Sequence, residues 1–206
     1  QIISMIAFQA DSKKLEVLLN ISNDIPRFIW TDPVRLRQIL VNLLGNAVKF
    51  TSQGEVELKV EAQKTYNEDE WLFTFAVRDT GIGIDESNQT KIFNAFSQED
   101  ESTTRKFGGT GLGLTISNKL LGLMESKLQL HSQKGFGSTF YFEIIVKAEQ
   151  GEPLQWENLE KLQKVLIVDD NANNRHILKD MLAIKSIASD QAENGIQALD
   201  FLKEGR

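Results

Sequence analysis

Apolar and polar residues recur with two different periods along most of the chain. Apolar side chains return every three or four positions at 1–13 and 33–50, which predicts two helices. An alternation with a period of two runs through 54–60 and 72–77, which predicts two long antiparallel strands joined by a polar turn. The remaining predicted elements are strands at 15–19, 27–30, 128–131 and 138–144 and a helix at 111–124.

This order of elements predicts an α/β fold, a two-layer sandwich with a mixed sheet and helices on one face. Pro33 suits the first position of its helix, and either Thr31 or Asp32 is expected to cap it. The pattern changes after a polar, acidic linker at about 148–163. The run Val165–Val168 is continuously apolar, which is typical of a strand buried on both faces. A helix, a short strand near residue 187 and a second helix follow, which predicts a β-α-β-α segment.

Composition narrows the class of protein. The chain has 206 residues, of which 41% are hydrophobic and 25% charged, as in a globular protein. A net charge of −6 without a long Lys/Arg block argues against nucleic acid as the main partner. The absence of cysteine excludes a disulfide scaffold and a thiolate metal site. The apolar stretches are too short for a membrane span, and the first residues predict a fragment of a longer protein.

Two asparagines mark the predicted helix at 33–50. Asn42 and Asn46 are four residues apart and therefore share one face of that helix. Asparagine is a modest helix former, so a pair of them in mid-helix suggests a specific use. An amide oxygen that coordinates a Mg²⁺ ion carrying nucleotide phosphates is one interpretation. Two ordinary amides on the helix surface are the alternative.

Two glycine segments follow further along the chain. Asp79-Thr80-Gly81-Ile82-Gly83-Ile84 comes directly after a predicted strand, where the carboxylate can accept a hydrogen bond from an exocyclic amine such as that of adenine. A tight turn with a capping aspartate is the alternative. The segment 108–114 is rich in glycine and runs into a helix, so its N–H groups suit an anion, with Arg105 and Lys106 just before it. It lacks the Gly-Lys-Ser/Thr of a P-loop, and a flexible loop is its alternative.

Other polar residues are less informative. Thr139 opens a predicted strand, and it either joins Asp79 through a water molecule or is an ordinary strand residue. The two histidines, His131 and His176, show neither a nucleophile arrangement nor metal-ligand spacing.

Taken together, these segments resemble the ATP-binding domain of hybrid sensor histidine kinases, in the wider family that includes gyrase, Hsp90 and MutL. The resemblance covers residues 15–146 and implies a Bergerat-type sandwich that binds ATP and Mg²⁺. One departure is Met124-Glu125-Ser126, where the family often carries glycines, and this implies an altered turn rather than an altered site. The matching segments are 32–51 for the N box, 79–84 for the G1 box, 91–98 for the F box, 102–108 for the lid of hybrid kinases and 109–114 for the G2 box.

The resemblance also assigns roles to single residues. Asp79 would bind the adenine amine with Thr139 assisting through water, and Asn46 would hold Mg²⁺ with Asn42 beside it. ATP-hydrolysing relatives have a glutamate at the position of Asn42, and an amide cannot act as a general base, which fits phosphoryl transfer to a side chain. The full set implied for ATP binding is Asn42, Asn46, Lys49, Phe50, Asp79, Gly81, Gly83, Ile84, Arg105, Gly109, Thr110, Gly111, Leu112, Gly113, Leu114 and Thr139.

The end of the chain has a resemblance of its own. Residues 164–206 resemble the opening of a response-regulator receiver domain, an incomplete doubly wound βαβα fragment in which Asp169 and Asp170 look like the acidic Mg²⁺ pair. We expect this fragment to pack loosely on the kinase domain or to be completed by another chain. The predicted divisions are 1–14, the end of an upstream helical dimerisation region or a linker; 15–147, the ATP-binding catalytic domain; 148–163, a linker; and 164–206, the N-terminal part of a receiver domain.

These resemblances predict a function. The chain is expected to bind Mg-ATP and to present its γ-phosphoryl group to a histidine on a separate dimerisation domain, in a two-component phosphorelay. Its expected partners are that dimerisation domain and a receiver domain within a homodimeric parent protein. The domain is expected to be cytoplasmic, and a membrane anchor elsewhere in the parent is compatible with this. A non-catalytic nucleotide-sensing module is the alternative, and an anti-sigma-type serine kinase is disfavoured by the receiver-like tail.

Overall fold

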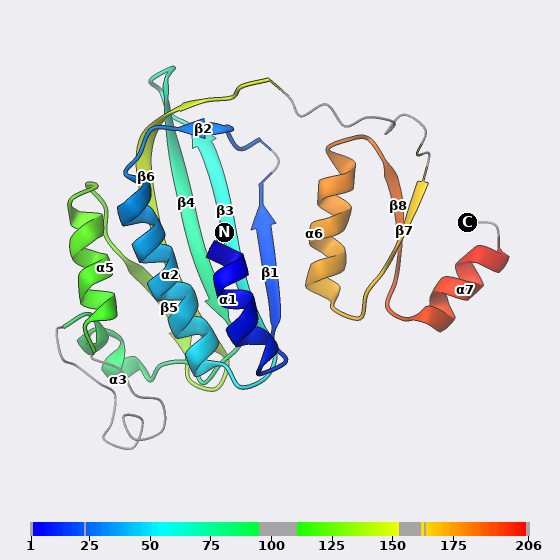
Figure 1. Ribbon diagram of the computed structural model, residues 1–206, viewed down its shortest axis with the longest axis horizontal. Coiled ribbons are helices and arrows are strands. Elements are labelled where there is room, and N and C mark those ends of the chain that lie inside the picture. The colour runs from blue at the N-terminus through cyan, green and yellow to red at the C-terminus, as the bar shows by residue number, and fades with distance from the viewer. Residues whose placement is uncertain (1, 23, 95–110, 153–161, 163, 205–206) are drawn as a thin grey trace. The chain divides into compact units, whose positions relative to one another are not determined.

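The computed structural model describes residues 2–22, 24–94, 111–152, 162 and 164–204 (Figure 1). The chain forms two compact units, Gln1–Gln150 and Gly151–Arg206. Three predicted site residues, Arg105, Gly109 and Thr110, lie outside the described residues, as does the predicted lid.

The first unit is built on a six-stranded mixed sheet with the order β1-β3-β4-β6-β2, in which β5 also pairs with β6. The β1–β3 pair is parallel and the other pairs are antiparallel. The mixed sheet therefore agrees with the prediction. Its strands are β1 (Glu16–Ile21), β2 (Phe28–Ile29), β3 (Glu55–Lys64), β4 (Glu70–Asp79), β5 (Gln129–Gln133) and β6 (Gly137–Glu149).

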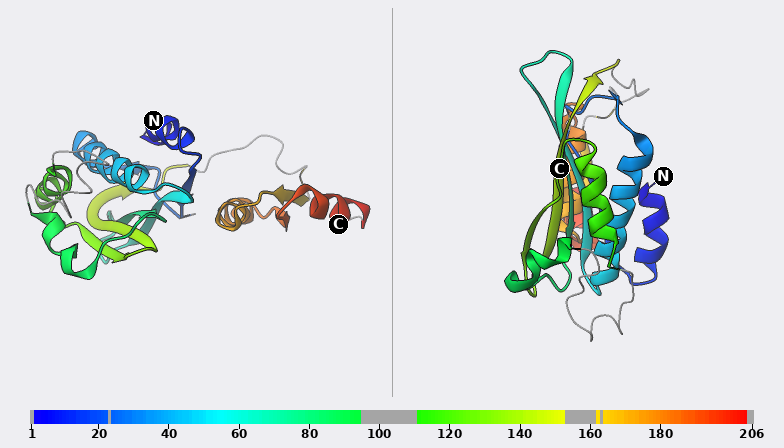
Figure 2. Two further views of the ribbon diagram at one scale, coloured as in Figure 1. Left: turned by 90° about the horizontal axis from the view of Figure 1, so that it is seen from below. Right: turned by 90° about the vertical axis from the view of Figure 1, so that its left-hand side faces the viewer.

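Three helices cover one face of this sheet, as predicted: α1 (Ile2–Asp11), α2 (Pro33–Phe50) and α5 (Gly113–Gly122) (Figure 2). A short helix, α3 (Glu86–Gln89), and a 3₁₀ turn, η1 (Lys91–Phe93), follow the end of β4.

The start of α2 shows how local sequence sets an element boundary. Asp32, not Thr31, is the cap, and its carboxylate accepts hydrogen bonds from the N–H groups of Val34 at 3.0 Å and Arg35 at 3.1 Å. The guanidinium of Arg35 also lies 3.0 Å from that carboxylate. Pro33 occupies the first turn, where its missing N–H group leaves no hydrogen bond unmade.

The core of the first unit lies between the helices and the inner face of the sheet. On β4 and β6, every second side chain enters it, and the rings of Phe75 and Phe142 stack with centroids 5.1 Å apart. The buried members of the core are Ile6, Ala10, Leu15, Ile39, Leu40, Leu43, Leu44, Ala47, Val48, Val56, Leu58, Val60, Phe73, Phe75, Val77, Leu121, Leu128, Phe140, Phe142 and Ile144.

The second unit is a two-stranded parallel sheet with two helices: β7 (Lys164–Val168), α6 (Ala172–Ala183), β8 (Ala188–Ala192) and α7 (Gly195–Lys203). The order of elements agrees with the predicted β-α-β-α pattern. The expectation that β7 is buried on both faces was wrong, because Ile167 is its one buried residue and Val168 is 47% exposed. Two strands and two helices cannot cover both faces of a strand.

A membrane crossing needs a long, continuously apolar helix, and none of the helices in the described segments meets that requirement.

Candidate functional site

Asp79 is a buried carboxylate at the end of β4, only 7% exposed. One of its oxygens, Oδ1, accepts a hydrogen bond of 2.8 Å from the N–H group of Gly81, and the carboxylate also accepts one from the N–H group of Ser138. Burial raises the pKa of Asp79, and these two donors and the charge of Arg78 oppose the rise. Because a carboxylate has about four acceptor positions, Asp79 retains capacity to bind an amine of a ligand.

The two glycines after Asp79 are required by close packing. A Cβ atom at Gly81 would come within 2.5 Å of the carbonyl oxygen of Phe50 and within 2.9 Å of Asp79 Oδ1. Gly83 has a positive φ of 63°, and a Cβ atom there would lie 2.0 Å from the carbonyl oxygen of Gln133. The segment 79–84 is therefore seated on the end of α2 and on the β5–β6 hairpin.

The hydroxyl group on the same face of the sheet as Asp79 belongs to Ser138 and not to Thr139, whereas we predicted that Thr139 assists Asp79. In the β4–β6 pairing, Ser138 lies opposite Asp79, whereas Thr139 lies opposite Arg78. Neighbouring strand residues point to opposite faces, so the Thr139 side chain leaves the sheet on the face away from the helices. The sequence did contain the signal, since Ser138 alternates in phase with the buried residues Phe140 and Phe142.

Ser132 extends this group of hydroxyls toward the end of the segment. Its Oγ accepts a hydrogen bond of 2.8 Å from the N–H group of Ile84 and lies 3.0 Å from the Oγ of Ser138. Gln89 Nε2 donates to the carbonyl oxygens of Ile84 at 3.2 Å and Ser132 at 2.9 Å. We did not identify Ser132, Ser138 or Gln89 from the sequence. A cavity of about 280 Å³ borders Ser132 and Gln89 and is lined by Ile84, Glu86, Gln89, Ser132, Gln133 and Lys134.

The two asparagines of α2 have different surroundings. Asn42 Nδ2 donates a hydrogen bond of 2.9 Å to Ser117 Oγ, and its Oδ1 occupies the space that a Cβ atom at Gly113 would need. Asn42 therefore joins α2 to the first turns of α5. Asn46, one turn later, has no hydrogen-bond partner for its side chain among the described residues, and a Cβ atom at Gly45 would meet nothing within 4 Å. There is therefore room beside Gly45, while Asn46 itself is partly buried.

Lys49 and Phe50 lie at the end of α2, close to the segment 79–84. The ammonium group of Lys49 is 4.7 Å from the centre of the Phe50 ring, and burial lowers the pKa of Lys49. The carbonyl oxygen of Phe50 accepts a hydrogen bond of 3.4 Å from the N–H group of Ile82. The structure therefore brings Phe50 and Gly81 together, although they come from different segments of the chain.

The described part of the second glycine segment is Gly111–Leu114. Gly111 has a φ of 68°, and α5 begins at Gly113 without a side-chain cap from Leu112. The first-turn N–H groups of α5 are therefore not used by a capping side chain, which suits an anionic ligand. Thr115 Oγ1 donates a hydrogen bond of 3.2 Å to the carbonyl oxygen of Phe93 and so ties this helix to η1.

The acidic pair of the second unit lies just after β7. Asp169 Oδ1 accepts a hydrogen bond of 2.8 Å from the N–H group of Asn171, and the side chain of Asn174 donates to its other oxygen. Asp170 is exposed. In the parts of the chain that the structure describes, no three His, Asp or Glu side chains come close enough to hold a metal ion.

The two histidines lie outside this arrangement. His131 is exposed on β5 and stacks on the ring of Tyr141 with centroids 5.1 Å apart, and His176 Nε2 lies 3.3 Å from a carboxylate oxygen of Asp180 on α6. Both contacts are ordinary surface contacts.

Known proteins share this sequence and fold. Residues 31–148 match the family described as histidine kinase-, DNA gyrase B- and HSP90-like ATPase. The chain is 37% identical over 203 residues to the autoinducer 2 sensor kinase/phosphatase LuxQ of Vibrio parahaemolyticus, which covers 94% of this chain. It is 44% identical over 144 residues, or 70% of this chain, to the signal transduction histidine-protein kinase BarA of Escherichia coli. The chain spans 24% of the length of the first relative and 16% of the second.

Two solved structures place these matches in three dimensions. The crystal structure of full-length ShkA in complex with AMPPNP has a TM-score of 0.75 and 31% sequence identity, over 97% of this chain and 40% of that chain. The catalytic domain of the histidine kinase ThkA has a TM-score of 0.55 and 24% identity over 71% of this chain and 89% of that chain, a likeness of fold alone.

Proposed function

The chain belongs to the histidine kinase-, DNA gyrase B- and HSP90-like ATPase family, and from this premise we propose that residues 15–147 bind Mg-ATP and present its γ-phosphoryl group to a histidine on a separate dimerisation domain. The observation that carries the proposal is the buried carboxylate of Asp79. It lies against the end of α2, where Asn46, Lys49 and Phe50 are also found. This arrangement supports recognition of an adenine amine at one end of the site and of phosphates along α2.

The adenine end is defined by acceptors and close packing. Asp79 accepts the exocyclic amine of the base, and the Ser138 hydroxyl assists on the same face of the sheet. Gly81 and Gly83 keep the adjacent backbone free of side chains. These contacts position the base, so that the phosphates extend toward α2 and the N-terminus of α5.

The residues at the phosphate end fit a bound Mg²⁺ ion. Asn46 offers an amide oxygen that has no hydrogen-bond partner among the described residues, and Mg²⁺ prefers oxygen ligands while keeping several waters. When bound, the ion offsets negative charge on the transferring phosphoryl group. Lys49 and, outside the described residues, Arg105 supply positive charge, and the N–H groups at Gly111–Leu114 donate to phosphate oxygens.

Asn42 favours phosphoryl transfer to a side chain over hydrolysis. Its carboxamide cannot take a proton from water, and its Nδ2 already donates to Ser117 Oγ. We therefore propose that the nucleophile is a histidine of the dimerisation domain, that the parent protein is a homodimer, and that this domain is cytoplasmic, where ATP is available.

We further propose that residues 164–206 begin a receiver domain. The parallel β7–β8 pair and its two helices support this, as does the placement of Asp169 and Asp170 directly after β7. A receiver would accept the phosphoryl group from the histidine in the next step of a phosphorelay.

Calorimetric titration of this chain with ATP, in the presence and absence of Mg²⁺, tests the site. The wild-type chain should bind ATP more tightly with Mg²⁺, and Asp79→Asn, which replaces an acceptor-only carboxylate by an amide, should abolish detectable binding. Asp169→Asn is the matched control in the second unit and should leave the affinity unchanged. Unaltered binding in Asp79→Asn would refute the adenine assignment.

A second experiment separates the kinase from a nucleotide-sensing module. The chain is mixed with a purified dimerisation domain and labelled ATP, and acid-labile label is measured on the added domain. Label on the histidine of the dimerisation domain supports phosphoryl transfer, provided that this chain acquires no label when it is incubated with ATP by itself. Nucleotide binding without any label would favour the sensing module.

A further inference from the structure

The side chain of Lys13 holds the end of the helix that carries the asparagines. Its Nζ atom donates hydrogen bonds to the carbonyl oxygens of Val48 at 2.7 Å, Lys49 at 3.0 Å and Thr51 at 3.1 Å. The last carbonyl groups of an α-helix have no partner within the helix and carry partial negative charge. The ammonium group of Lys13 therefore caps α2 from a distant part of the sequence.

The position of Lys13 is set by the packing of α1. Ile6 and Ala10 of this helix are buried in the core, and the helix ends in a turn in which the N–H group of Leu15 donates to the carbonyl oxygen of Ala10 at 3.0 Å. The N–H group of Glu16 then donates to the carbonyl oxygen of Gly54 at 3.0 Å, at the start of the sheet. Lys13 is thus attached on one side to α1 and on the other to the sheet.

The end of α2 also packs against the segment 79–84, which orients the Asp79 side chain. The carbonyl oxygen of Phe50 accepts from the N–H group of Ile82 and lies so close to Gly81 that no side chain fits there. The N–H group of Gly81 in turn holds Asp79 Oδ1 at 2.8 Å. A continuous series of contacts therefore runs from the Lys13 ammonium group through the end of α2 to the carboxylate.

We propose that Lys13 is a positioning residue for the nucleotide: by holding residues 48–51 in place, it keeps the Phe50 carbonyl under the Gly81 turn and Asp79 in its binding position. The inference rests on the proposed function of that site. Without the ammonium group, the end of α2 opens more often and the fraction of molecules with a competent site falls, which weakens the apparent affinity. The same series of contacts joins the end of α1 to the proposed nucleotide site.

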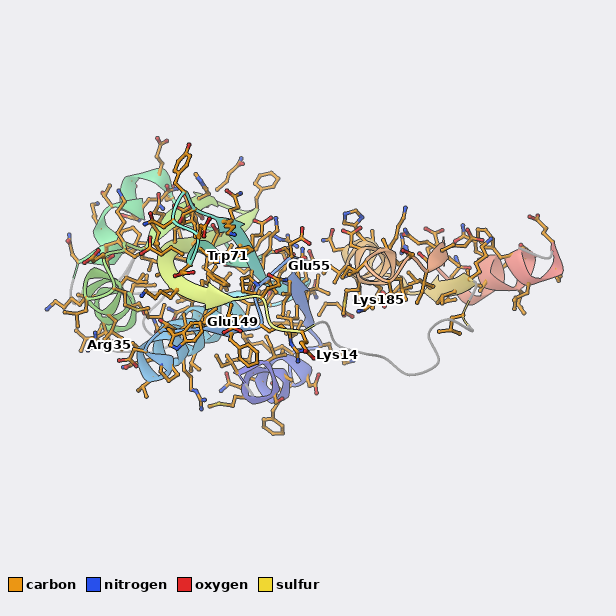
Figure 3. The ribbon with its side chains drawn as sticks, turned by 90° about the horizontal axis from the view of Figure 1, so that it is seen from above. Lys14, Arg35, Glu55, Trp71, Glu149 and Lys185 are labelled. Atoms are coloured by element: carbon orange, nitrogen blue, oxygen red, sulfur yellow. The ribbon has the colours of Figure 1, made fainter. Side chains whose placement is uncertain are left out.

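The test is calorimetric binding of ADP and ATP to this chain and to three variants. Lys13→Met removes the charge and keeps the length of the side chain. It should lower the affinity for ADP and for ATP by the same factor, about threefold to tenfold, as expected for one lost helix-end charge. Lys13→Arg should restore most of the affinity. Lys14→Met is the control: it makes the same change of charge one residue away, in the turn between α1 and β1, and should bind like wild type (Figure 3).

A loss confined to ATP would overturn the proposal, because Lys13 would then act on the phosphates and not on Asp79. Equal affinities in wild type and Lys13→Met would also overturn it, as would an equal loss in Lys14→Met. A wild-type chain that binds neither nucleotide would instead refute the proposed function.

If Lys13→Met is less stable than wild type, hydrogen exchange of the unliganded variants separates a local loosening near Asp79 from a general loss of stability. Exchange should rise at the amides of Thr51, Gly81 and Ile82 and stay unchanged at core amides of β6 such as that of Phe142. A uniform rise through the first unit would show that Lys13 has only a general structural role and would contradict the proposal.

Discussion

The two units of the chain use the same local signals and differ in what they bury. Helices α1, α5 and α6 all end in the same turn, in which a residue with a left-handed φ of 56° follows the helix: Lys14, Glu125 and Ser186. In the first unit these helices cover a six-stranded sheet over a continuous core. In the second unit the described residues bury only Ile167, Ile177, Ile187 and Ala192 among hydrophobic side chains.

This difference in buried core matters for function because a buried charged group must be held by well-packed, hydrogen-bonding neighbours. The first unit holds the Asp79 carboxylate in its core, where burial opposes ionisation. The second unit keeps Asp170 exposed and leaves an apolar face of α7 uncovered, with Ile196 at 76%, Leu199 at 57% and Leu202 at 64% exposure. Well-formed helices and strands are thus common to both units, whereas a buried and hydrogen-bonded carboxylate is found in the first.

The largest expected difference is in the cost of a cavity. Ile144→Ala should destabilise the first unit by about 2–5 kcal/mol, because this side chain is 2% exposed within a close-packed core. Ile177→Ala, the matched change in the second unit, should cost at or below the lower end of that range, since fewer neighbours surround it. The stability of the first unit is measured by urea unfolding with nucleotide binding as the signal. The stability of the second unit is measured by hydrogen exchange of the amides of α6. Equal losses would contradict the difference in packing.

The next expected effect is the cost of keeping Asp79 buried. Its pKa is raised in the folded state, so its contribution to stability is fully present below its ordinary value of 3.8 and is lost as the pH rises through the raised pKa. The asparagine of Asp79→Asn does not ionise, so this variant does not lose stability in that way as the pH rises. From about pH 4 to pH 7 the free energy of unfolding of Asp79→Asn should therefore increase relative to wild type, as urea titrations at several pH values would show. A difference that stays constant or moves in the other direction would argue against burial as the dominant influence.

A smaller effect distinguishes the two faces of β6 within the first unit. Ser138→Ala should weaken ADP binding by about threefold to tenfold, the value of one hydrogen bond near the ligand. Thr139→Val, on the opposite face, should leave the affinity unchanged. If Thr139→Val weakened binding and Ser138→Ala did not, the assignment drawn from the β4–β6 register would be wrong.

The smallest effect should be the same in both units. Glycine at a left-handed position after a helix avoids the strain of a Cβ atom, so Glu125→Gly and Ser186→Gly should each stabilise their unit by about 0.5–1 kcal/mol. Thermal unfolding and hydrogen exchange measure the two gains. Because the turn is local, similar gains would confirm that the units differ in long-range packing and not in how their helices end.

Much of the first unit could be predicted from the sequence. The period of the apolar residues predicted its sheet and helices, and Pro33 predicted the first residue of α2, although the cap was left open between Thr31 and Asp32. The segments around Asn42, Asp79 and Gly111 are predicted to form one site because their residue types and order are specific. The roles of all the predicted site residues, Asp79 included, stay predictions until ligand binding is measured.

What the sequence determined by itself is the set of elements and chemical groups: helix caps, strand periods, a carboxylate after a strand and glycines where no Cβ atom fits. These signals act over a few neighbouring residues, so they can be read without knowing the fold. The tertiary structure alone decided that Lys13 caps α2 and that Ser138, which the alternation of β6 already places on the inner face, pairs with Asp79. Both depend on which distant segments meet and in which register, and a shift of one residue in a strand pair would exchange its two faces.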